Sequence, residues 1–584
     1  MSRFSRCRRI SFAAVLFCMM LVAEPRPAEA GPGADPVERV DAFLTRLVPF
    51  GYSGAVIVER DGKVVLRKAY GMADREAGVA MTPDHVFTIG SITKQFTGAA
   101  ILKLEMQGKL STDDLLSKYI DGVPADKKSI TLHQLLTHTA GFGGASGDDF
   151  APDGTRDRVV RQVLAEPLLS APGETYRYSN IGYSLLGAVV EIVSGQSYEA
   201  YLAEHLFAPA GMKRTGYLLP GYEPSELAVG YREGRRWGTV LERPMLEDGP
   251  SWHLRANGGI HSTVDDMRLW HRALLDDTVL SAAAREKYFH PFAAEGPDGE
   301  SHYGYGWSIS ESPTGGTRIA HNGGNMVFGA DCHRYVEDGL MMFVTKTSSE
   351  IEVDALGFGV ADTLFGEGPD LPPAVVELDD EALERLAGTY SVGGADAGAA
   401  STFTVTFGGG KIELRGGGRS SRLAKKHGQT AMAAFRSWIV EDDPKPLHAA
   451  MAGAVPLERL QAGVDDMLGM REEMYGSFRE VSVAVAREEA MQCRVVLRMT
   501  HERGAGLVQC LFAGDDLVEI RPLQDLPKQS RTLHPVSPTR FESFSLVQGG
   551  RVRADFAATE DGGPVDRLVV SGLGSRKIRA MRVD

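Results

Sequence analysis

The chain has 584 residues, which is too long for one hydrophobic core, so we expect two to four domains. Its composition, 43% hydrophobic and 24% charged, is that of a soluble globular protein and excludes a disordered chain. The formal net charge of −14 disfavours nucleic acid or an anionic membrane surface as a partner.

The first thirty residues have the pattern of a signal peptide. Four arginines within residues 3–9 precede an apolar stretch at 10–22, and residues 28–30 (Ala-Glu-Ala) form a small-x-small cleavage site. The apolar stretch is too short to remain as a membrane-spanning helix. The alternatives are an uncleaved anchor or a lipoprotein modified at Cys18, although Phe17 is a poor neighbour for that modification. We therefore expect cleavage and export, to the periplasm or out of the cell, with no stable membrane insertion afterwards.

Cleavage after residue 30 would change both the charge and the cysteine count. It removes five arginines and two glutamates, so the formal charge falls to −17. It leaves Cys332, Cys493 and Cys510, an odd number that argues against a disulfide framework. Cys493 and Cys510 could still pair across a hairpin, or both could be small buried thiols.

The first half of the chain has strands at its two ends and helices between them. A helix is predicted at 36–48, and a hairpin at 54–60 and 64–70 around the Asp61-Gly62 turn. Helical periodicity dominates from Ser91 onward. Strands return at 317–321, 327–335 and 340–347, before a helix-like segment at 351–365. This order predicts an antiparallel sheet built from both ends of the stretch, with helices flanking it and a helical subdomain.

A Gly- and Pro-rich linker at 366–373 separates this part from a more β-rich one. We expect a serine-hydrolase-sized domain at 31–368, then a β-rich domain made of 376–426 and 527–584. An inserted α+β module at 427–526 would interrupt it, although three modules in a row fit nearly as well. The module's helical stripe and strands are Leu457, Leu460, Val464 and Leu468, followed by 481–485, 493–499, 507–512 and 517–520.

The first motif with chemical meaning is Ser91-Ile92-Thr93-Lys94. The apolar residues that follow recur at helical spacing, so Ser91 should lie at a helix N-terminus with Lys94 one turn along. Serine needs a nearby base to act as a nucleophile, and a helix N-terminus favours the negative charge that develops in acyl transfer. Taken alone, the tetrad is common by chance, and a capped helix with a solvated lysine is then the better interpretation.

Two further motifs follow along the chain. Tyr178-Ser179-Asn180 precedes an apolar helical stripe. The hydroxyl of Tyr178 could move a proton, and the amide of Asn180 could orient a substrate. A packed aromatic beside a helix cap is the simpler interpretation. His321-Asn322-Gly323-Gly324 ends a predicted strand, where glycines let a main-chain N–H approach a substrate. An ordinary loop after an edge strand is the alternative.

The three motifs together, in this order and setting, closely resemble the serine β-lactamase-related family. That family includes class C β-lactamases, D-alanyl-D-alanine carboxypeptidases, D-aminopeptidases and related esterases. The resemblance covers roughly 37–365 and says little about 376–584. Its further matching segments are 94–97 (KQFT), 134–141 (QLLTHTAG), 178–183 (YSNIGY), 258–263 (GGIHST) and 303–307 (YGYGW).

The resemblance implies a fold and a set of roles. The fold is the α/β (α+β) penicillin-recognising serine hydrolase fold, here followed by a β-rich C-terminal domain with a small α+β module. Ser91 would be the nucleophile, Lys94 its proton partner, and Tyr178 the general base and proton shuttle. The substrate would be bound by Asn180, His321, Gly323 and Gly324, with the N–H groups of Ser91 and Gly324 as the oxyanion hole. His138 is expected to be scaffolding.

His321 is the main departure from the family pattern, because many relatives have lysine there. Histidine is mostly neutral at neutral pH, so it should attract a substrate carboxylate less strongly. Esters, or peptides and amides of D-amino acids, are therefore favoured over efficient β-lactam turnover. Neither a metal site nor a cofactor is predicted, since no H-E-x-x-H or paired C-x-x-C occurs. The G-x-S-x-G elbow of α/β-hydrolases is also missing.

Three functions remain open at this point. The first is an exported hydrolase that cleaves a small-molecule or peptide substrate through a Ser91 acyl-enzyme. The second is a cell-wall D-alanyl-D-alanine carboxypeptidase. The third is a penicillin-binding or sensory protein that acylates without efficient turnover. The sequence does not indicate an oligomeric state.

Overall fold

The computed structural model describes residues 35–583, with gaps at 145–146, 367, 393–401, 417–421, 442, 452–476, 490–491, 503–504, 514–515, 524–529, 545, 547–550, 559–563 and 573–576. The expected signal peptide and the helical stripe at 457–468 lie outside the described residues. No helix in the described ranges is both long and apolar enough to cross a membrane.

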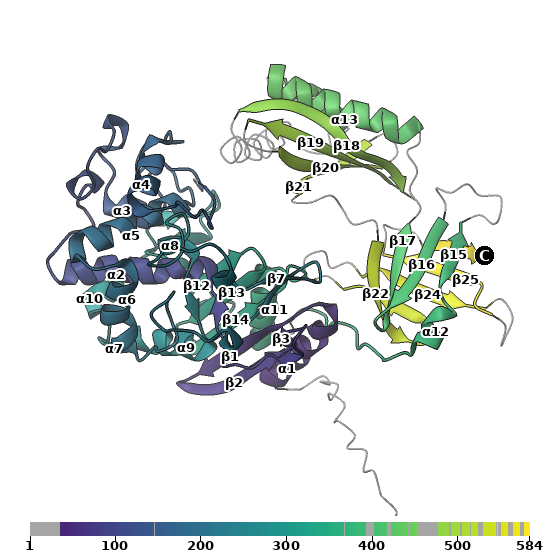
Figure 1. Cartoon of the computed structure of the whole chain (residues 1–584), viewed down its shortest axis with the longest axis horizontal. Coiled ribbons are helices and arrows are strands. Elements are labelled where there is room, and N and C mark those ends of the chain that lie inside the picture. The colour runs from purple at the N-terminus through teal and green to yellow at the C-terminus, as the bar shows by residue number, and fades with distance from the viewer. Residues whose placement is uncertain are drawn as a thin grey trace, which may run out of the picture.

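An eight-stranded antiparallel sheet is the centre of the first half (Figure 1). As predicted, strands from both ends of this half lie side by side, because the β1–β2 hairpin pairs with β14. The strand order is β2 (Lys63–Tyr70), β1 (Gly54–Arg60), β14 (Leu340–Lys346), β13 (Phe328–Tyr335), β12 (Thr317–Asn325), β11 (Ser308–Glu311), β10 (Ser301–Tyr303) and β9 (Ala293–Ala294).

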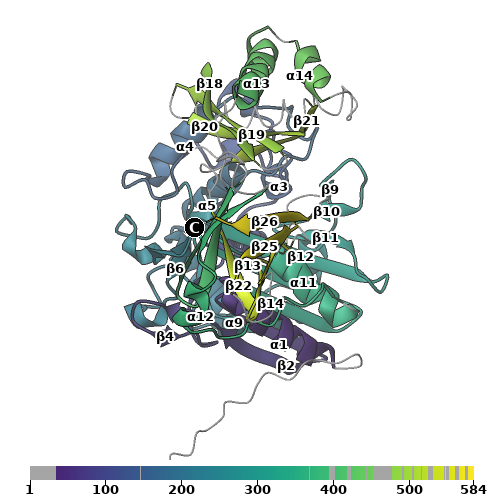
Figure 2. The same ribbon diagram turned by 90° about the vertical axis from the view of Figure 1, so that its right-hand side faces the viewer.

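Strand β1 is buried on both faces of this sheet, which explains why it is almost continuously apolar. Alternate residues of a strand point to opposite faces. Val56 and Val58 pack with α1 (Pro36–Leu47) and α11 (Val353–Phe365) on one face. Ala55 and Ile57 join the larger core on the other face, which the helices cover. The result is a layer of two helices, the sheet, and a helical layer, and Figure 2 shows the two helices α1 and α11 next to each other.

The helical layer and the subdomain beyond it come from the middle of this half, as predicted. Short paired strands occur within it: β3 (Met72–Asp74) with β4 (Val79–Ala80), β5 (Phe87–Thr88) with β8 (His261–Ser262), and β6 (Gly230–Arg232) with β7 (Arg235–Gly238). The helices are α2 (Thr93–Met106), α3 (Leu132–Leu136), α4 (Arg156–Ala165), α5 (Asn180–Ser194), α6 (Tyr198–Leu202), α7 (Ala208–Ala210), α8 (Arg255–Gly258), α9 (Val264–Ala273) and α10 (Ala282–Tyr288).

The second half contains a closed β-barrel, preceded by α12 (Asp380–Glu384). The chain leaves the barrel after β17 and rejoins it at β22, which pairs with β17. The domain boundaries given above stay a prediction. The barrel strands are β15 (Gly388–Ser391), β16 (Thr402–Gly408), β17 (Lys411–Gly416), β22 (Ser530–Ser537), β23 (Arg540–Glu542), β24 (Arg553–Ala557), β25 (Arg567–Ser571) and β26 (Ile578–Arg582).

Between β17 and β22 lies an α+β unit with its own core. Its four-stranded sheet carries α13 (Arg422–Glu441) on one side (Figure 1). Cys493 and Cys510 are buried thiols in it and no disulfide joins them, so the pairing left open by the sequence does not occur. The remaining elements are α14 (Lys445–Ala450), β18 (Phe478–Glu489), β19 (Gln492–His501), β20 (Ala505–Ala513) and β21 (Asp516–Leu523).

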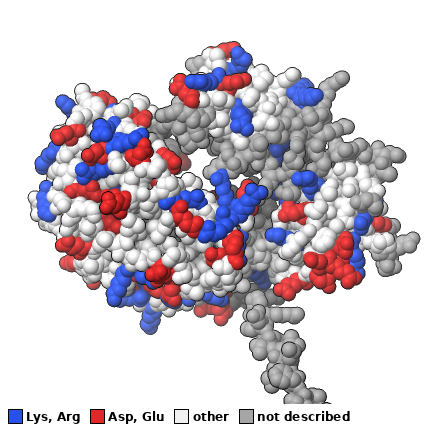
Figure 3. Space-filling view, in the orientation of Figure 1, with Lys and Arg blue, Asp and Glu red and all other residues white. Residues whose placement is uncertain are grey.

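The surface is of mixed charge on the face drawn in Figure 3, where acidic and basic side chains are interspersed. Basic side chains gather near the β6–β7 hairpin, whose sequence supplies Arg232, Arg235 and Arg236. Arg236 is paired with Glu242 at 2.7 Å. The described part of this face therefore lacks the extended basic stripe that would indicate nucleic-acid binding.

Candidate active site

The nucleophile motif lies where a short 3₁₀ turn (Gly90–Ile92) runs into α2. Gly90 has a positive φ of 54°, and a Cβ there would lie 2.5 Å from the nitrogen of Gly324. Glycine is therefore required on both conformational and steric grounds. The turn presents half-buried Ser91 at the start of the helix, as the sequence predicted.

Lys94 is fully buried, one turn along from Ser91. Its Nζ lies 3.0 Å from Ser91 Oγ and donates to Asn180 Oδ1 at 2.7 Å and to the carbonyl oxygen of Asn257 at 2.8 Å. The two fixed acceptors orient two of the amine's positions, so the third faces Ser91. That third position is an N–H when the amine is protonated, and a lone pair that can accept the serine proton when it is neutral.

The electrostatics of Lys94 favour the neutral form more than in an exposed lysine. Burial lowers the pKa of Lys94 well below its usual 10.5, and the negative charge of Asp149 partly opposes this shift. A lysine whose pKa is lowered by burial is suited to be a general base near neutral pH. Lys94 can therefore take the proton of Ser91.

Tyr178 lies close to both groups. Its ring is 4.8 Å from Lys94 Nζ, and its hydroxyl is close enough to Ser91 for the two to influence each other. Burial raises the pKa of the Tyr178 hydroxyl above its usual 10, although the nearby Ser91 side chain opposes the shift. The hydroxyl is therefore protonated in the free protein, which suits a proton relay better than a ready-made base.

His138 packs against Tyr178 and holds the main chain next to it. Its Nδ1 accepts a hydrogen bond from the Ser179 nitrogen at 3.1 Å, and its ring lies 4.4 Å from the Tyr178 ring. Burial, followed by the charges of Lys94 and His321, lowers its pKa well below 6.5. These contacts support the scaffolding role expected for His138.

β12 extends further than the sequence indicated. It was expected to end at residue 321 with a loop after it, but it pairs with β13 through Asn325. Gly323 allows the strand to continue past the nucleophile turn because it has no side chain: a Cβ there would lie 2.1 Å from the oxygen of Ile89. Gly323 therefore seats the strand against residues 89–91, while Gly324 remains exposed beside Ser91.

His321 is buried under the site as a neutral ring. Its Nδ1 faces the main-chain oxygen of Asn322 and so carries the proton, which leaves Nε2 to accept from the Tyr303 hydroxyl at 2.8 Å. Burial, followed by the charge of Lys94, lowers its pKa to about 4. Both ring nitrogens are thus occupied within the protein, and His321 itself carries no positive charge that could attract a carboxylate.

The segments around these residues are held by close packing. Gly306 in the YGYGW segment has φ 87°, and a Cβ there would lie 2.6 Å from the oxygen of Lys94. The nitrogen of Ile260 donates to Thr93 Oγ1 at 3.1 Å, which fixes the GGIHST segment to the start of α2. The strand and loop segments that match the family are therefore those that contact the nucleophile helix.

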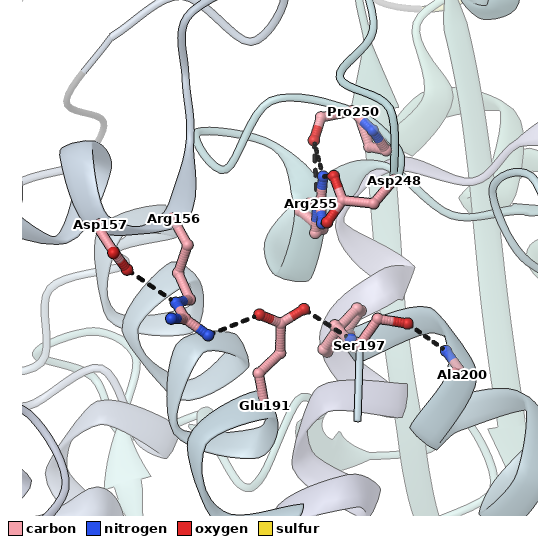
Figure 4. A network of polar contacts seen from close by, with 9 residues as sticks. Arg156, Asp157, Glu191, Ser197, Ala200, Asp248, Pro250 and Arg255 are labelled. Carbon is pink, nitrogen blue, oxygen red and sulfur yellow. Dashed lines mark hydrogen bonds and ion pairs between the residues drawn. The ribbon is translucent and has the colours of Figure 1, made fainter. Parts of the chain in front are cut away.

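A further ion-pair network supports α8, which carries the Asn257 carbonyl. Buried Arg255 pairs with both carboxylate oxygens of Asp248 at 2.6 Å and donates to the oxygen of Pro250 (Figure 4). Beside it, Glu191 on α5 accepts from Arg156 on α4 and from the nitrogen of Tyr198 at the start of α6. These contacts join the loop before α8 and three helices around the site.

The described residues 143–144 and 147–154 add an acid that the sequence did not single out. The Gly143 and Gly144 carbonyl oxygens accept from Ser179 Oγ and from the Asn180 nitrogen. Asp149 in this loop is close enough for its charge to act on Lys94, and burial followed by the charge of Asp148 raises its pKa to about 6. No group of three or more metal-ligating side chains occurs in the described ranges.

These couplings predict opposite pH shifts for two variants. Asn180→Asp places a charge 2.7 Å from Lys94 Nζ, so it should raise the pKa of Lys94 by about one unit or more. Asp149→Asn removes a charge that raises this pKa, so it should lower it, chiefly above about pH 6 where Asp149 is ionised. In the pH profile of kcat/KM for a p-nitrophenyl ester, the acid limb should move to higher pH in Asn180→Asp and to lower pH in Asp149→Asn.

Asp153→Asn is the matched control, because Asp153 lies in the same loop, is exposed and pairs with Arg158 instead. Its profile should overlay that of the wild type. An unmoved acid limb in Asn180→Asp would mean that the titrating group is not Lys94.

Comparison with known proteins gives a consistent result. The family model for Beta-lactamase matches residues 51–356, more than half of the chain. The chain is 33% identical over 275 residues to "Putative penicillin-binding protein PbpX" of Bacillus subtilis (strain 168), covering 47% of this chain and 66% of that protein. It is 27% identical over 338 residues to "Putative D-alanyl-D-alanine carboxypeptidase" of Escherichia coli O157:H7, covering 50% of this chain and 76% of that protein.

A solved structure matches over a greater length. The octameric penicillin-binding protein homologue from Pyrococcus abyssi aligns with a TM-score of 0.52 and 21% identity, covering 83% of this chain and 99% of that one. At this identity the match concerns the fold alone. The family model covers more than half of the chain, so the chain belongs to the Beta-lactamase family.

Proposed function

We propose that the chain is an exported serine hydrolase that cleaves an ester or amide bond through an acyl-enzyme on Ser91. The contact of buried Lys94 Nζ with Ser91 Oγ carries this proposal. A buried amine with two of its positions held by carbonyl oxygens has one remaining partner, and that partner is the hydroxyl of the nucleophile.

The reaction follows from this arrangement. Lys94 accepts the proton as Ser91 Oγ attacks the substrate carbonyl carbon, and the N–H groups of Ser91 and Gly324 stabilise the oxyanion. The protonated Lys94 passes its proton through Tyr178 to the leaving alcohol or amine, and the acyl-enzyme forms. Water then loses a proton along the same route, attacks the ester carbonyl and releases the acid product with Ser91 restored.

The charges around the site narrow the substrate class. His321 is neutral, and Asp149 contributes a negative charge above about pH 6. A substrate carboxylate would therefore meet no fixed cation in place of the lysine found in many relatives. We propose small-molecule esters, or amides and peptides of D-amino acids, as substrates, with β-lactams turned over slowly.

Two other functions use the same residues. A D-alanyl-D-alanine carboxypeptidase is suggested by the name of the Escherichia coli relative, but its substrate ends in a carboxylate that neutral His321 does not favour. A penicillin-binding protein that acylates without efficient turnover is suggested by the name of the Bacillus subtilis relative. Asn180 would position substrate in all three cases, and His321 would contribute by shaping the site, because both of its ring nitrogens are bonded within the protein.

We also propose the domain organisation that the sequence predicted. In it, 1–30 is a cleaved signal peptide, 31–368 is the hydrolase domain, and 427–526 is inserted into a β-rich domain made of 376–426 and 527–584. The pairing of β17 with β22 supports the insertion. The protein would act outside the cytoplasm, in the periplasm or after secretion.

The test is to expose the purified chain to a fluorescent penicillin, p-nitrophenyl esters of increasing acyl length, and D-alanine p-nitroanilide. Wild type and Ser91→Ala are compared, and mass spectrometry locates any acyl group. We expect ester or anilide turnover that depends on Ser91, and a penicillin adduct on Ser91 that is lost slowly.

Each result separates the candidate functions. A stoichiometric burst on every substrate without steady turnover would favour the penicillin-binding alternative. Cleavage of a D-alanyl-D-alanine peptide faster than of esters would favour the carboxypeptidase. Turnover that persists in Ser91→Ala would refute the acyl-enzyme proposal.

A further inference from the structure

A cavity lies away from Ser91, at the other end of the central sheet. It encloses about 210 Å³ between α9 and the strands β1, β13 and β14, which is room for about seven water molecules. Arg334, which lines it, is five residues along β13 from Gly329, the strand partner of Gly324. That separation is about 17 Å along the strand. No residue that contacts Ser91 or Lys94 is among those lining the cavity: Glu59, Asp61, Gly62, His271, Leu275, Arg334, Tyr335, Val336, Gly339 and Leu340.

Arg334 is the unusual residue of this cavity, because it is a buried cation without an acid. Only 5% of it is exposed, and its guanidinium lies over the rings of Phe289 and Trp307. Its Nε donates to His271 Nδ1 at 3.0 Å, and its Nη1 has no hydrogen-bond partner within the part of the chain that is described. Buried arginines are normally paired with carboxylates, so this guanidinium lacks a counter-charge.

The acids nearby do not supply that charge. Glu59 is buried and bonded to Arg268, and its second arginine neighbour is Arg272 at 3.7 Å. Asp61 is exposed at the turn between β1 and β2, and no salt bridge joins either acid to Arg334 in the described ranges. His271 is neutral, since burial and the charges of the three arginines lower its pKa to about 3. Its Nδ1 accepts from Arg334, so Nε2 carries the proton and is a further donor.

The rest of the lining is apolar. Leu275, Tyr335, Val336 and Leu340 surround the cavity, and Leu275 is 59% exposed, which places it at the rim. A ligand that fits must therefore bring a negative charge to Arg334 and an apolar body to these side chains. A hydrated inorganic anion would satisfy only the first condition.

We propose that this cavity binds a small organic carboxylate, with the carboxylate on Arg334 and the apolar body against Leu275, Tyr335 and Leu340. A planar carboxylate matches the guanidinium in shape and would supply the counter-charge that Arg334 lacks. The site is distinct from the acyl-enzyme site, so its occupation does not depend on the reaction proposed for Ser91.

The test is calorimetric titration of the full chain with 4-iodobenzoate and with 4-iodobenzamide, its neutral counterpart. We expect saturable binding of the carboxylate and at least tenfold weaker binding of the amide. Arg334→Met should weaken 4-iodobenzoate binding at least tenfold. Arg161→Gln, which removes an exposed arginine on α4, should bind like the wild type. Anomalous scattering from iodine in a crystal should place the ligand beside Arg334.

A second variant covers the case in which Arg334→Met does not fold. Leu275→Trp changes an exposed position at the rim, so it should fold, fill the cavity and abolish binding. Equal binding of acid and amide, iodine found only at Ser91, or no binding by the wild type would each overturn the proposal. Inorganic phosphate competing as well as 4-iodobenzoate would overturn the assignment of an organic carboxylate.

Discussion

Replacing Lys94 by methionine is expected to abolish turnover as completely as replacing Ser91 by alanine, by roughly 10⁴-fold or more in kcat. The reason is that Lys94 Nζ is the basic group in hydrogen-bond contact with Ser91 Oγ, and both are needed for one proton transfer. Because the two residues act as a unit, the double variant should be no slower than either single variant. Initial rates on a p-nitrophenyl ester measure this.

Methionine is chosen because it has a similar length and fits a fully buried position. A thermal unfolding curve close to that of the wild type would show that the fold is kept. Lys103→Met on the same helix is the control: Lys103 Nζ donates to the oxygen of Val279, far from Ser91 in the chain, and its activity should be retained. If Lys94→Met kept more than about a hundredth of wild-type kcat, Lys94 would not be the base.

Gly323→Ala is expected to reduce kcat/KM by about 100-fold and to destabilise the protein by about 1–3 kcal/mol. A Cβ at this position would lie 2.1 Å from the oxygen of Ile89 and 2.6 Å from the nitrogen of Ser91. Both are main-chain atoms next to the nucleophile, so relief of the clash must move the turn that carries Ser91. Ester hydrolysis and thermal unfolding measure the two effects.

The neighbouring glycine separates lack of space from a general intolerance of this strand. At Gly324 an added Cβ would meet only the oxygen of Phe328 at 3.9 Å, so Gly324→Ala should unfold at nearly the wild-type temperature. Gly408→Ala, at an open position at the end of β16, is a control for both measurements. If Gly323→Ala matched the wild type in both, the close packing of β12 on the turn would be unimportant.

The sequence predicted those parts of the site that depend on local spacing. Ser91 and Lys94 are three residues apart on a periodic helix, so their proximity follows from helix geometry alone. The strands at the two ends of the first half, such as β1 and β14, were predictable because each is a short run of apolar or alternating residues bounded by turn signals. Tyr178 and His321 were predicted to lie in the same site only from the resemblance to the family, because no local sequence spacing connects them to Ser91.

Other features of the structure could not be predicted from the sequence, because they depend on main-chain atoms or on contacts between segments that are distant in the chain. Lys94 is held by the carbonyl oxygen of Asn257, and any residue type has a carbonyl oxygen. The extension of β12 depends on the space left by Gly323, which only the packed structure shows. Asp149 and Arg334 could not be selected from the sequence, because a sequence does not show which charged side chains are buried.

The pairing of β17 with β22 has a consequence for the way the chain acquires its structure during synthesis. The two strands are separated by the 113 residues of 417–529, so the barrel cannot close until all of them have been translated. At usual elongation rates that takes roughly 6–23 s. During this interval the first three barrel strands have an unpaired edge on β17, a site at which nascent chains can associate wrongly. The intervening unit, which has a core of its own, can fold first and hold the two halves of the barrel within reach of each other.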